Sequence, residues 1–130
     1  MSAIDEVLAE ARASLRRVPP SASLLTDENT LIVDIRPQHN RAEEGEIPGS
    51  VVIERIVLEW RLDPGGDYRI EGFDKDTTVV VVCNESYSSS LAARDLQRLG
   101  LRNATDLIDG FRGWKAAGLL TRPGGTTPIT

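Results

Sequence analysis

The sequence predicts an α/β protein in which a parallel sheet carries helices on both faces. Two apolar runs, Thr30–Asp34 and Thr77–Val82, lack the polar alternation of a half-exposed strand, which is typical of strands covered on both sides. Stretches with helical spacing of apolar residues alternate with such runs, and this alternation implies right-handed crossovers. The length of 130 residues suits one domain with a self-sufficient core.

The N-terminal stretch between Ser2 and Arg17 has the pattern of an amphipathic helix. Its apolar residues recur at helical spacing, and Ser2 precedes two acids in the position of an N-cap. Pro19 and Pro20 end this helix, and Pro20 can begin a second short helix through Leu25.

Strands and helices alternate through the rest of the chain. The β-branched run Thr77–Val82 is the strongest strand signal and ends directly at Cys83. The longest loop should be Asp63–Asp76, which is rich in Gly, Asp and Pro. The remaining predicted elements are a strand at Val51–Ile53, a helix that starts near Ser89 and ends at Gly100, a strand at Ala104–Ile108 and a helix at Gly110–Ala117.

The segment boundaries follow from these patterns. Residues 1–16 are expected to be a helical extension, residues 17–120 the domain, and the polar residues 121–130 a flexible C-terminal tail.

Composition excludes several classes of partner and site. Fifteen Lys and Arg against twenty Asp and Glu give a net charge of −5 without long blocks of one sign, so we expect neither a nucleic-acid nor a membrane partner. The single cysteine, Cys83, and single histidine, His39, cannot assemble a usual structural zinc site, and no metal is expected. Because the N-terminus lacks a signal-peptide pattern, we expect a cytoplasmic protein, whose lone thiol stays reduced.

Cys83 lies at the carboxyl end of a central strand, where ligands bind in open α/β sheets. The following loop, Cys83–Ser88, can turn its backbone N–H groups inward and, with the helix that starts near Ser89, form an anion cradle. Such a cradle stabilises a thiolate, the nucleophilic form of cysteine. The alternative is that Cys83 is a small buried hydrophobe, but its place between a buried strand and a polar loop favours a functional role.

Four motifs give the sequence a family resemblance. They are Asp34-Ile35-Arg36, the segment Gly45–Ser50 (GEIPGS), the loop Cys83–Ser88 (CNESYS) and the segment Asp109–Trp114 (DGFRGW). In this order and at these separations they resemble the single-domain rhodanese-like sulfurtransferases.

The resemblance implies a five-stranded parallel sheet and a nucleophilic Cys83. This cysteine would take a sulfane sulfur from a small-molecule or protein-bound donor, hold it as a persulfide and pass it to a thiol or to cyanide. No cofactor is used in that chemistry. The substrate would bind at the loop residues Asn84, Glu85, Ser86, Tyr87, Ser88 and Ser89.

The loop departs from the family pattern in its charge. Asn84 and Ser88 replace basic residues of the common loop, Ser86 replaces a frequent Gly, and Glu85 adds an anion. Because cations favour the thiosulfate dianion, thiosulfate is expected to be a poor donor here. Outside the loop, Glu46 replaces a usual His and Asp109 a usual Gly, and both are interpreted as structural, since Asp tolerates unusual backbone angles.

Several further residues have two interpretations. Asp34 and Arg36 lie on the same sheet edge as Cys83, but a structural pair that pins loops is the better interpretation. Arg55 could supply a cation at the mouth of the pocket or form a surface ion pair with Glu54 or Glu59. The remaining candidates are His39, expected at the surface, Trp114, expected in the core, and Trp60, a candidate for the entrance of the site.

The preferred hypothesis is therefore a sulfurtransferase with Cys83 as nucleophile. The alternative is a catalytically weak module that binds a protein partner or senses redox state through Cys83. A phosphatase or arsenate reductase is disfavoured, because such enzymes place an arginine six residues after the cysteine and this chain has Ser89 there.

Overall fold

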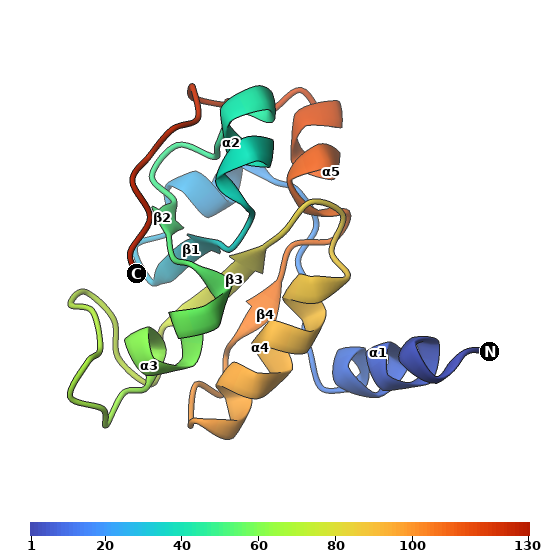
Figure 1. Cartoon of the computed structure of the whole chain (residues 1–130), viewed down its shortest axis with the longest axis vertical. Coiled ribbons are helices and arrows are strands. Elements are labelled where there is room, and N and C mark those ends of the chain that lie inside the picture. Colours follow the sequence, from blue (N-terminus) through green and yellow to red (C-terminus); the bar gives the residue numbers. More distant parts are fainter.

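The computed structural model describes residues 1–130 and contains one parallel sheet between two layers of helices (Figure 1). The sheet has the order β2-β1-β3-β4, so β3 and β1 are central. Its strands are β1 (Thr30–Asp34), β2 (Val51–Val52), β3 (Thr78–Val82) and β4 (Thr105–Asp106).

The sheet has four strands, and the expected fifth strand is absent. Val18 takes its place beside β4, where its N–H donates to the Asp106 carbonyl at 3.1 Å and its carbonyl accepts from the Ile108 N–H at 2.8 Å. Pro19 and Pro20 follow immediately, and proline has no N–H with which to continue a ladder. Pairing therefore stops at a single bridge.

The predicted helices are present, and the chain forms two further α-helices, at Gln38–Glu44 and at Leu58–Leu62. The N-terminal helix is shorter than the predicted Ser2–Arg17, because the Ser14 hydroxyl and N–H both bond to the Ala11 carbonyl and end it. The five α-helices are α1 (Ala3–Ala13), α2 (Gln38–Glu44), α3 (Leu58–Leu62), α4 (Ser88–Arg98) and α5 (Gly110–Ala116), joined by the short 3-10 helices η1 (Ala22–Leu25) and η2 (Arg55–Val57).

Alternate residues of β3 face two separate cores. Val79 and Val81 point to the same side as Cys83, where α3 and α4 pack on the sheet. Val80 and Val82 point to the other side and pack with Phe111 and Trp114 of α5. Because every residue from Val79 to Val82 is buried, the uninterrupted apolar run is explained.

The two ends of the chain pack against the domain. Helix α1 lies beside α4 and projects outward at its N-terminus (Figure 1). Residues 121–130, expected to be a flexible tail, make contacts with the domain: Arg122 pairs with Glu46, and the Ile129 N–H donates to the Val52 carbonyl at 2.8 Å. Residues 63–76 form the predicted long loop without a helix or strand.

None of the helices combines the length and apolar character needed to cross a membrane.

Candidate active site

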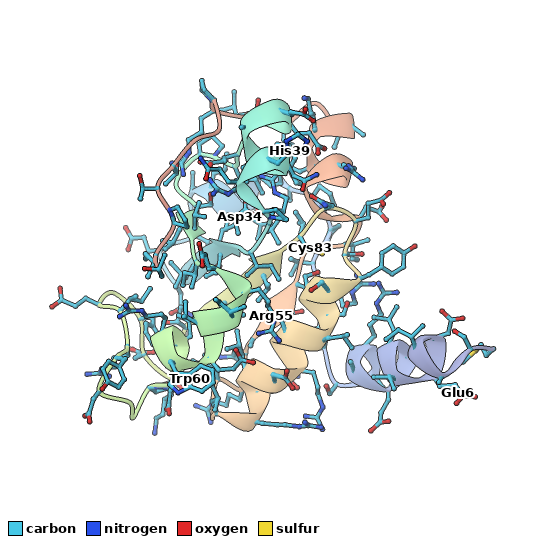
Figure 2. All side chains as sticks on the ribbon, in the orientation of Figure 1. Glu6, Asp34, His39, Arg55, Trp60 and Cys83 are labelled. Carbon is cyan, nitrogen blue, oxygen red and sulfur yellow. The ribbon has the colours of Figure 1, made fainter.

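Cys83 follows β3 immediately and lies at the start of the loop that enters α4 (Figure 2). Its side chain is on the α4 side of the sheet, and 8% of the residue is exposed. The backbone N–H of Ser89, in the first turn of α4, donates to Cys83 Sγ at 3.3 Å. The thiol is therefore held at a helix N-terminus, where partial positive charge favours an anion.

In the loop around Cys83, carbonyl groups accept hydrogen bonds from residues outside the loop, whereas the backbone N–H groups have no acceptor. The carbonyls of Cys83 and Asn84 accept from the N–H groups of Phe111 and Arg112, at 2.9 and 3.2 Å. The backbone N–H groups of residues 84 to 88, in contrast, donate to no acceptor of the protein. Five unpaired donors in one short loop are the arrangement that binds an anion.

Gly110 allows α5 to approach the loop this closely. A Cβ at this position would lie 2.6 Å from both the Cys83 and the Asn84 carbonyl oxygens, closer than real Cβ contacts occur. Asp109 and Gly110 both have positive φ, at 62° and 61°. The expectation that Asp109 adopts an unusual backbone angle is confirmed, and the sequence Asp-Gly explains how the N-terminus of α5 reaches the loop.

Ser86 shapes the loop through its backbone. Its φ is 76°, a left-handed conformation that costs a residue with a side chain about 1–2 kcal/mol. The Ser86 carbonyl accepts a hydrogen bond from Arg12 Nη2 at 2.8 Å. Ser90 Oγ lies 3.0 Å from the same carbonyl, but its single proton is shared with the closer Asp106 carboxylate at 2.7 Å. The bond from Arg12 therefore contributes most to offsetting the strain of the left-handed residue.

A buried carboxylate supports the helix start beneath the loop. Asp106, at the end of β4, accepts from Ser89 Oγ at 2.8 Å and from Ser90 Oγ at 2.7 Å. Arg17 pairs with the same carboxylate at 2.7 Å. Asp106 thereby fixes the residue whose N–H contacts Cys83 Sγ.

Arg12 brings a positive charge to the Cys83 loop, which has no basic residue of its own. It comes from α1, outside the domain expected from the sequence, and forms no ion pair with any carboxylate. Besides its bond to Ser86, its Nε donates to Ser90 Oγ at 3.0 Å, and its guanidinium lies 5.7 Å from the centre of the Tyr87 ring.

The carboxylate of Glu85 is partly neutralised. Arg112 Nη1 lies 3.3 Å from Glu85 Oε1, and Arg112 also pairs with Glu44 at 3.0 Å. The hydrogen bond and the charge of Glu44, with a smaller contribution from Glu85, raise the pKa of Arg112. The hydrogen bond from Arg112 in turn holds the pKa of Glu44 below its ordinary value. Glu85 is therefore less repulsive than its charge alone implies.

The two alternatives for Arg55 are separated by its contacts. Arg55 pairs with Glu59 at 2.8 Å and with Asp95 of α4 at 3.4 Å, so its charge is already neutralised. Trp60 is exposed and lies away from Cys83, beyond Arg55, rather than at the loop (Figure 2). His39 is exposed on α2 and pairs with Glu43 at 3.4 Å.

Asp34 and Arg36 form a buried pair at the end of β1. Arg36 Nη2 lies 2.7 Å from Asp34 Oδ2 and donates to the Gly45 carbonyl at the same distance. Its guanidinium also lies 4.0 Å from the centre of the Phe111 ring. The pair thus connects β1 both to the segment that precedes β2 and to α5, and it supports the Cys83 loop indirectly, through α5.

Glu46, which replaces the usual His of the family pattern, is fully buried away from the loop. It pairs with Arg41 at 2.7 Å and with Arg122 at 3.1 Å, and accepts from Thr126 Oγ1 at 2.6 Å. Burial alone would raise the pKa of Glu46, but the hydrogen bonds from Thr126, Arg41 and Arg122 together lower it to about 2. Glu46 therefore holds the C-terminal residues in place as a carboxylate.

The sequence patterns did not identify Arg12, Ser90, Asp106 or Gly110 as site residues. Arg12 and Ser86 are 74 residues apart in the chain, so no local sequence pattern indicates their contact. For Asp106 the sequence offered one signal: an acidic residue lies inside the predicted strand Ala104–Ile108, and a buried carboxylate needs hydrogen-bond partners. No group of three His, Cys, Asp or Glu side chains gathers anywhere in the chain to hold a metal.

Known proteins resemble this chain in sequence and in fold. The sequence profile of the rhodanese-like domain matches residues 21–117. The thiosulfate sulfurtransferase GlpE from Pseudomonas fluorescens is 30% identical over 104 residues, which are 79% of this chain and 87% of GlpE. The adenylyltransferase and sulfurtransferase UBA4 from Scheffersomyces stipitis is 35% identical over 86 residues, which are 65% of this chain but 19% of UBA4.

A solved structure extends the similarity to nearly the whole chain. It is a Rhodopseudomonas palustris protein of unknown function, described as a possible tyrosine phosphatase. It is 29% identical, covers 94% of this chain and 96% of its own, and superposes with a TM-score of 0.82.

Proposed function

Because the chain belongs to the family of rhodanese-like domains, we propose that it is a sulfurtransferase with Cys83 as its nucleophile. The observation that carries the proposal is the loop itself. Cys83 Sγ accepts from the Ser89 N–H, and the five preceding N–H groups of the loop have no partner in the protein. Such a loop suits a thiolate that becomes longer by one sulfur atom and keeps its negative charge.

The reaction has two steps. The Cys83 thiolate attacks the outer, sulfane sulfur of a donor; a new S–S bond forms at Cys83, and the electron pair of the broken bond leaves with the remainder of the donor, as sulfite when the donor is thiosulfate. In the second step an acceptor thiolate or cyanide attacks the terminal sulfur of the Cys83 persulfide. The product carries that sulfur away, and the Cys83 thiolate is restored.

The donor can be a small molecule or a protein-bound persulfide, and the acceptor a thiol or cyanide. The loop contains no cation of its own, which argues for a donor less charged than thiosulfate. However, the contact of Glu85 with Arg112 reduces the repulsion that we expected from the sequence. A reducing compartment such as the cytoplasm would keep the thiol available.

Intact-mass spectrometry tests the nucleophile directly, because Cys83 is the single cysteine of the chain. After incubation with thiosulfate, with an inorganic polysulfide or with a small-molecule persulfide, the protein should gain the mass of one sulfur atom and lose it again on addition of cyanide. The Cys83→Ser variant should fold, since Ser matches Cys in shape, but gain no sulfur and form no thiocyanate. Thiocyanate formation by the folded variant would refute the assignment.

Two other functions make different predictions. A binding or redox-sensing module would gain no sulfur from any donor, although its Cys83 could still react with an oxidant. A phosphatase needs a guanidinium to clamp the equatorial oxygens of the phosphoryl group. The position that would supply it holds Ser89, whose side chain is fully buried against Asp106, so sulfur transfer is the better supported proposal.

A further inference from the structure

The loop around Cys83 depends on a residue outside the domain. Helix α1 precedes residues 21–117, the part that matches the family profile, and its C-terminal half packs beside α4. Arg12 extends from this helix to the loop and donates to the Ser86 carbonyl and to Ser90 Oγ. Ala11 and Leu15, on either side of it in the sequence, are buried, which fixes the direction from which Arg12 arrives.

The contact falls on the one loop residue whose conformation is strained. Ser86 is left-handed, a conformation that Gly adopts freely and that Ser adopts only with support. In this conformation the Ser86 carbonyl points to Arg12 and to Ser90 instead of accepting from an N–H of the loop. This carbonyl therefore takes up none of the N–H groups of residues 84 to 88, and no other acceptor of the protein binds them.

The charge of Arg12 is not used in an ion pair. No carboxylate lies within pairing distance of its guanidinium, and the Tyr87 ring covers one face of it. A hydrogen bond from an ionised donor is roughly twice as strong as a neutral one. The bond to Ser86 is thus the strongest single interaction that holds the loop carbonyl in its position.

We propose that Arg12 is the positioning residue of the Cys83 loop: it stabilises the left-handed Ser86 and so keeps the loop N–H groups directed at the thiolate and its persulfide. This inference rests on the proposed sulfurtransferase function for its consequence, but not for its structural part. Arg12 acts through the loop, since its own donors are bound to Ser86 and Ser90 and not to Cys83.

Hydrogen–deuterium exchange of the Ser89, Phe111 and Arg112 amides, which donate to Cys83 Sγ and to the Cys83 and Asn84 carbonyls, tests the structural part without any assay of activity. Exchange at these amides should be at least about threefold faster in Arg12→Ala, because a local opening of the loop costs less once a charge-assisted hydrogen bond is lost. The matched control is Arg16→Ala, since Arg16 is an exposed arginine of the same segment with no hydrogen bond or ion pair. Equal exchange in both variants would overturn the inference, whether or not the protein transfers sulfur.

Rates of sulfur transfer in Arg12 variants show whether Arg12 acts by positioning the loop or by attracting the donor through its charge. Arg12→Ala should lower kcat about tenfold for an anionic and for an uncharged donor alike, and Arg12→Lys should recover little, because an ammonium lacks the fork that reaches both Ser86 and Ser90. Arg16→Ala should change neither rate. Full recovery in Arg12→Lys, or a loss confined to thiosulfate and abolished by salt, would show that Arg12 acts as a cation on the donor and would overturn the inference.

The Ser86→Gly background provides a rescue test. Glycine adopts the left-handed conformation without strain, so the loop needs Arg12 less. The loss caused by Arg12→Ala should therefore shrink from about tenfold to about threefold or less in this background. A loss of the same size in both backgrounds would refute the link between Arg12 and Ser86.

Discussion

Replacing Gly110 with alanine should damage the loop around Cys83 from the side of α5. The left-handed φ of 61° costs an alanine about 1–2 kcal/mol by itself. The new Cβ would also lie 2.6 Å from the Cys83 and Asn84 carbonyl oxygens, whereas ordinary contact begins at 3.4 Å. Forcing an additional group into such a packed site typically costs about 1–3 kcal/mol, so Gly110→Ala should lower the free energy of unfolding by about 2–5 kcal/mol in total.

Gly118 provides the matched control for this substitution. Its φ of 75° is also left-handed, but a Cβ there would meet no atom within 4 Å. Gly118→Ala should therefore carry the backbone cost alone, about 1–2 kcal/mol. The difference between the two variants measures the close approach of α5 to the loop.

Urea unfolding, followed by the fluorescence of the buried Trp114, gives both free energies. Because the backbone can relieve the clash only by stretching the bonds from Phe111 and Arg112 to the loop, Gly110→Ala should also reduce sulfur transfer by more than about tenfold. Gly118→Ala should retain nearly full activity. Equal losses of stability in the two variants, or a fully active Gly110→Ala, would refute the argument that this glycine shapes the loop.

Two further predictions follow from the chemistry of the site and of the tail. Aryl phosphates should not be hydrolysed, because no arginine clamps a phosphoryl group at the loop, and release of phosphate that depends on Cys83 at more than roughly 1 per second would contradict this. The pKa of Glu46 is lowered from 4.5 to about 2, so its contribution to stability, roughly 3 kcal/mol, is complete above pH 4.5 and is lost as the pH falls toward 2. This pH dependence can be measured by urea unfolding of the wild type and of Glu46→Gln between pH 7 and pH 2. The difference in the free energy of unfolding between the two proteins should shrink at low pH. A difference that does not depend on pH would show that the carboxylate charge is not what stabilises the protein.

The central strands were predictable because their apolar, β-branched residues favour a buried strand over a helix or a loop. An unbroken run of β-branched residues from Thr77 to Val82 fits a strand buried on both faces, and β3 is that strand. Helix α2 was missed because six of its seven residues are polar, and the one that it buries is Arg41, which no apolar pattern can mark. The fifth strand was expected from family resemblance alone, and two prolines reduce it to a bridge.

The candidate site was predictable to the extent that it is local. A cysteine between a buried strand and a polar loop indicates a nucleophile at a helix N-terminus, and this is where Cys83 lies. The residues that support it, Arg12, Asp106 and Gly110, reach the loop from segments far along the chain. Their contacts depend on how α1, β4 and α5 pack around the loop, which no pattern within a short window encodes.

The two termini also protect the sheet from association with other chains. An edge strand of a sheet offers unpaired N–H and C=O groups to any extended segment, and this is a route to aggregation. Here Ile129 bonds to Val52 and Glu54 beside the edge strand β2, while Val18 bonds to Asp106 and Ile108 beside the edge strand β4, so a segment near each end of the chain covers part of each edge. Shortening the chain before Ile129 would expose the edge at β2, and the shortened protein should be more prone to aggregate than to lose its fold.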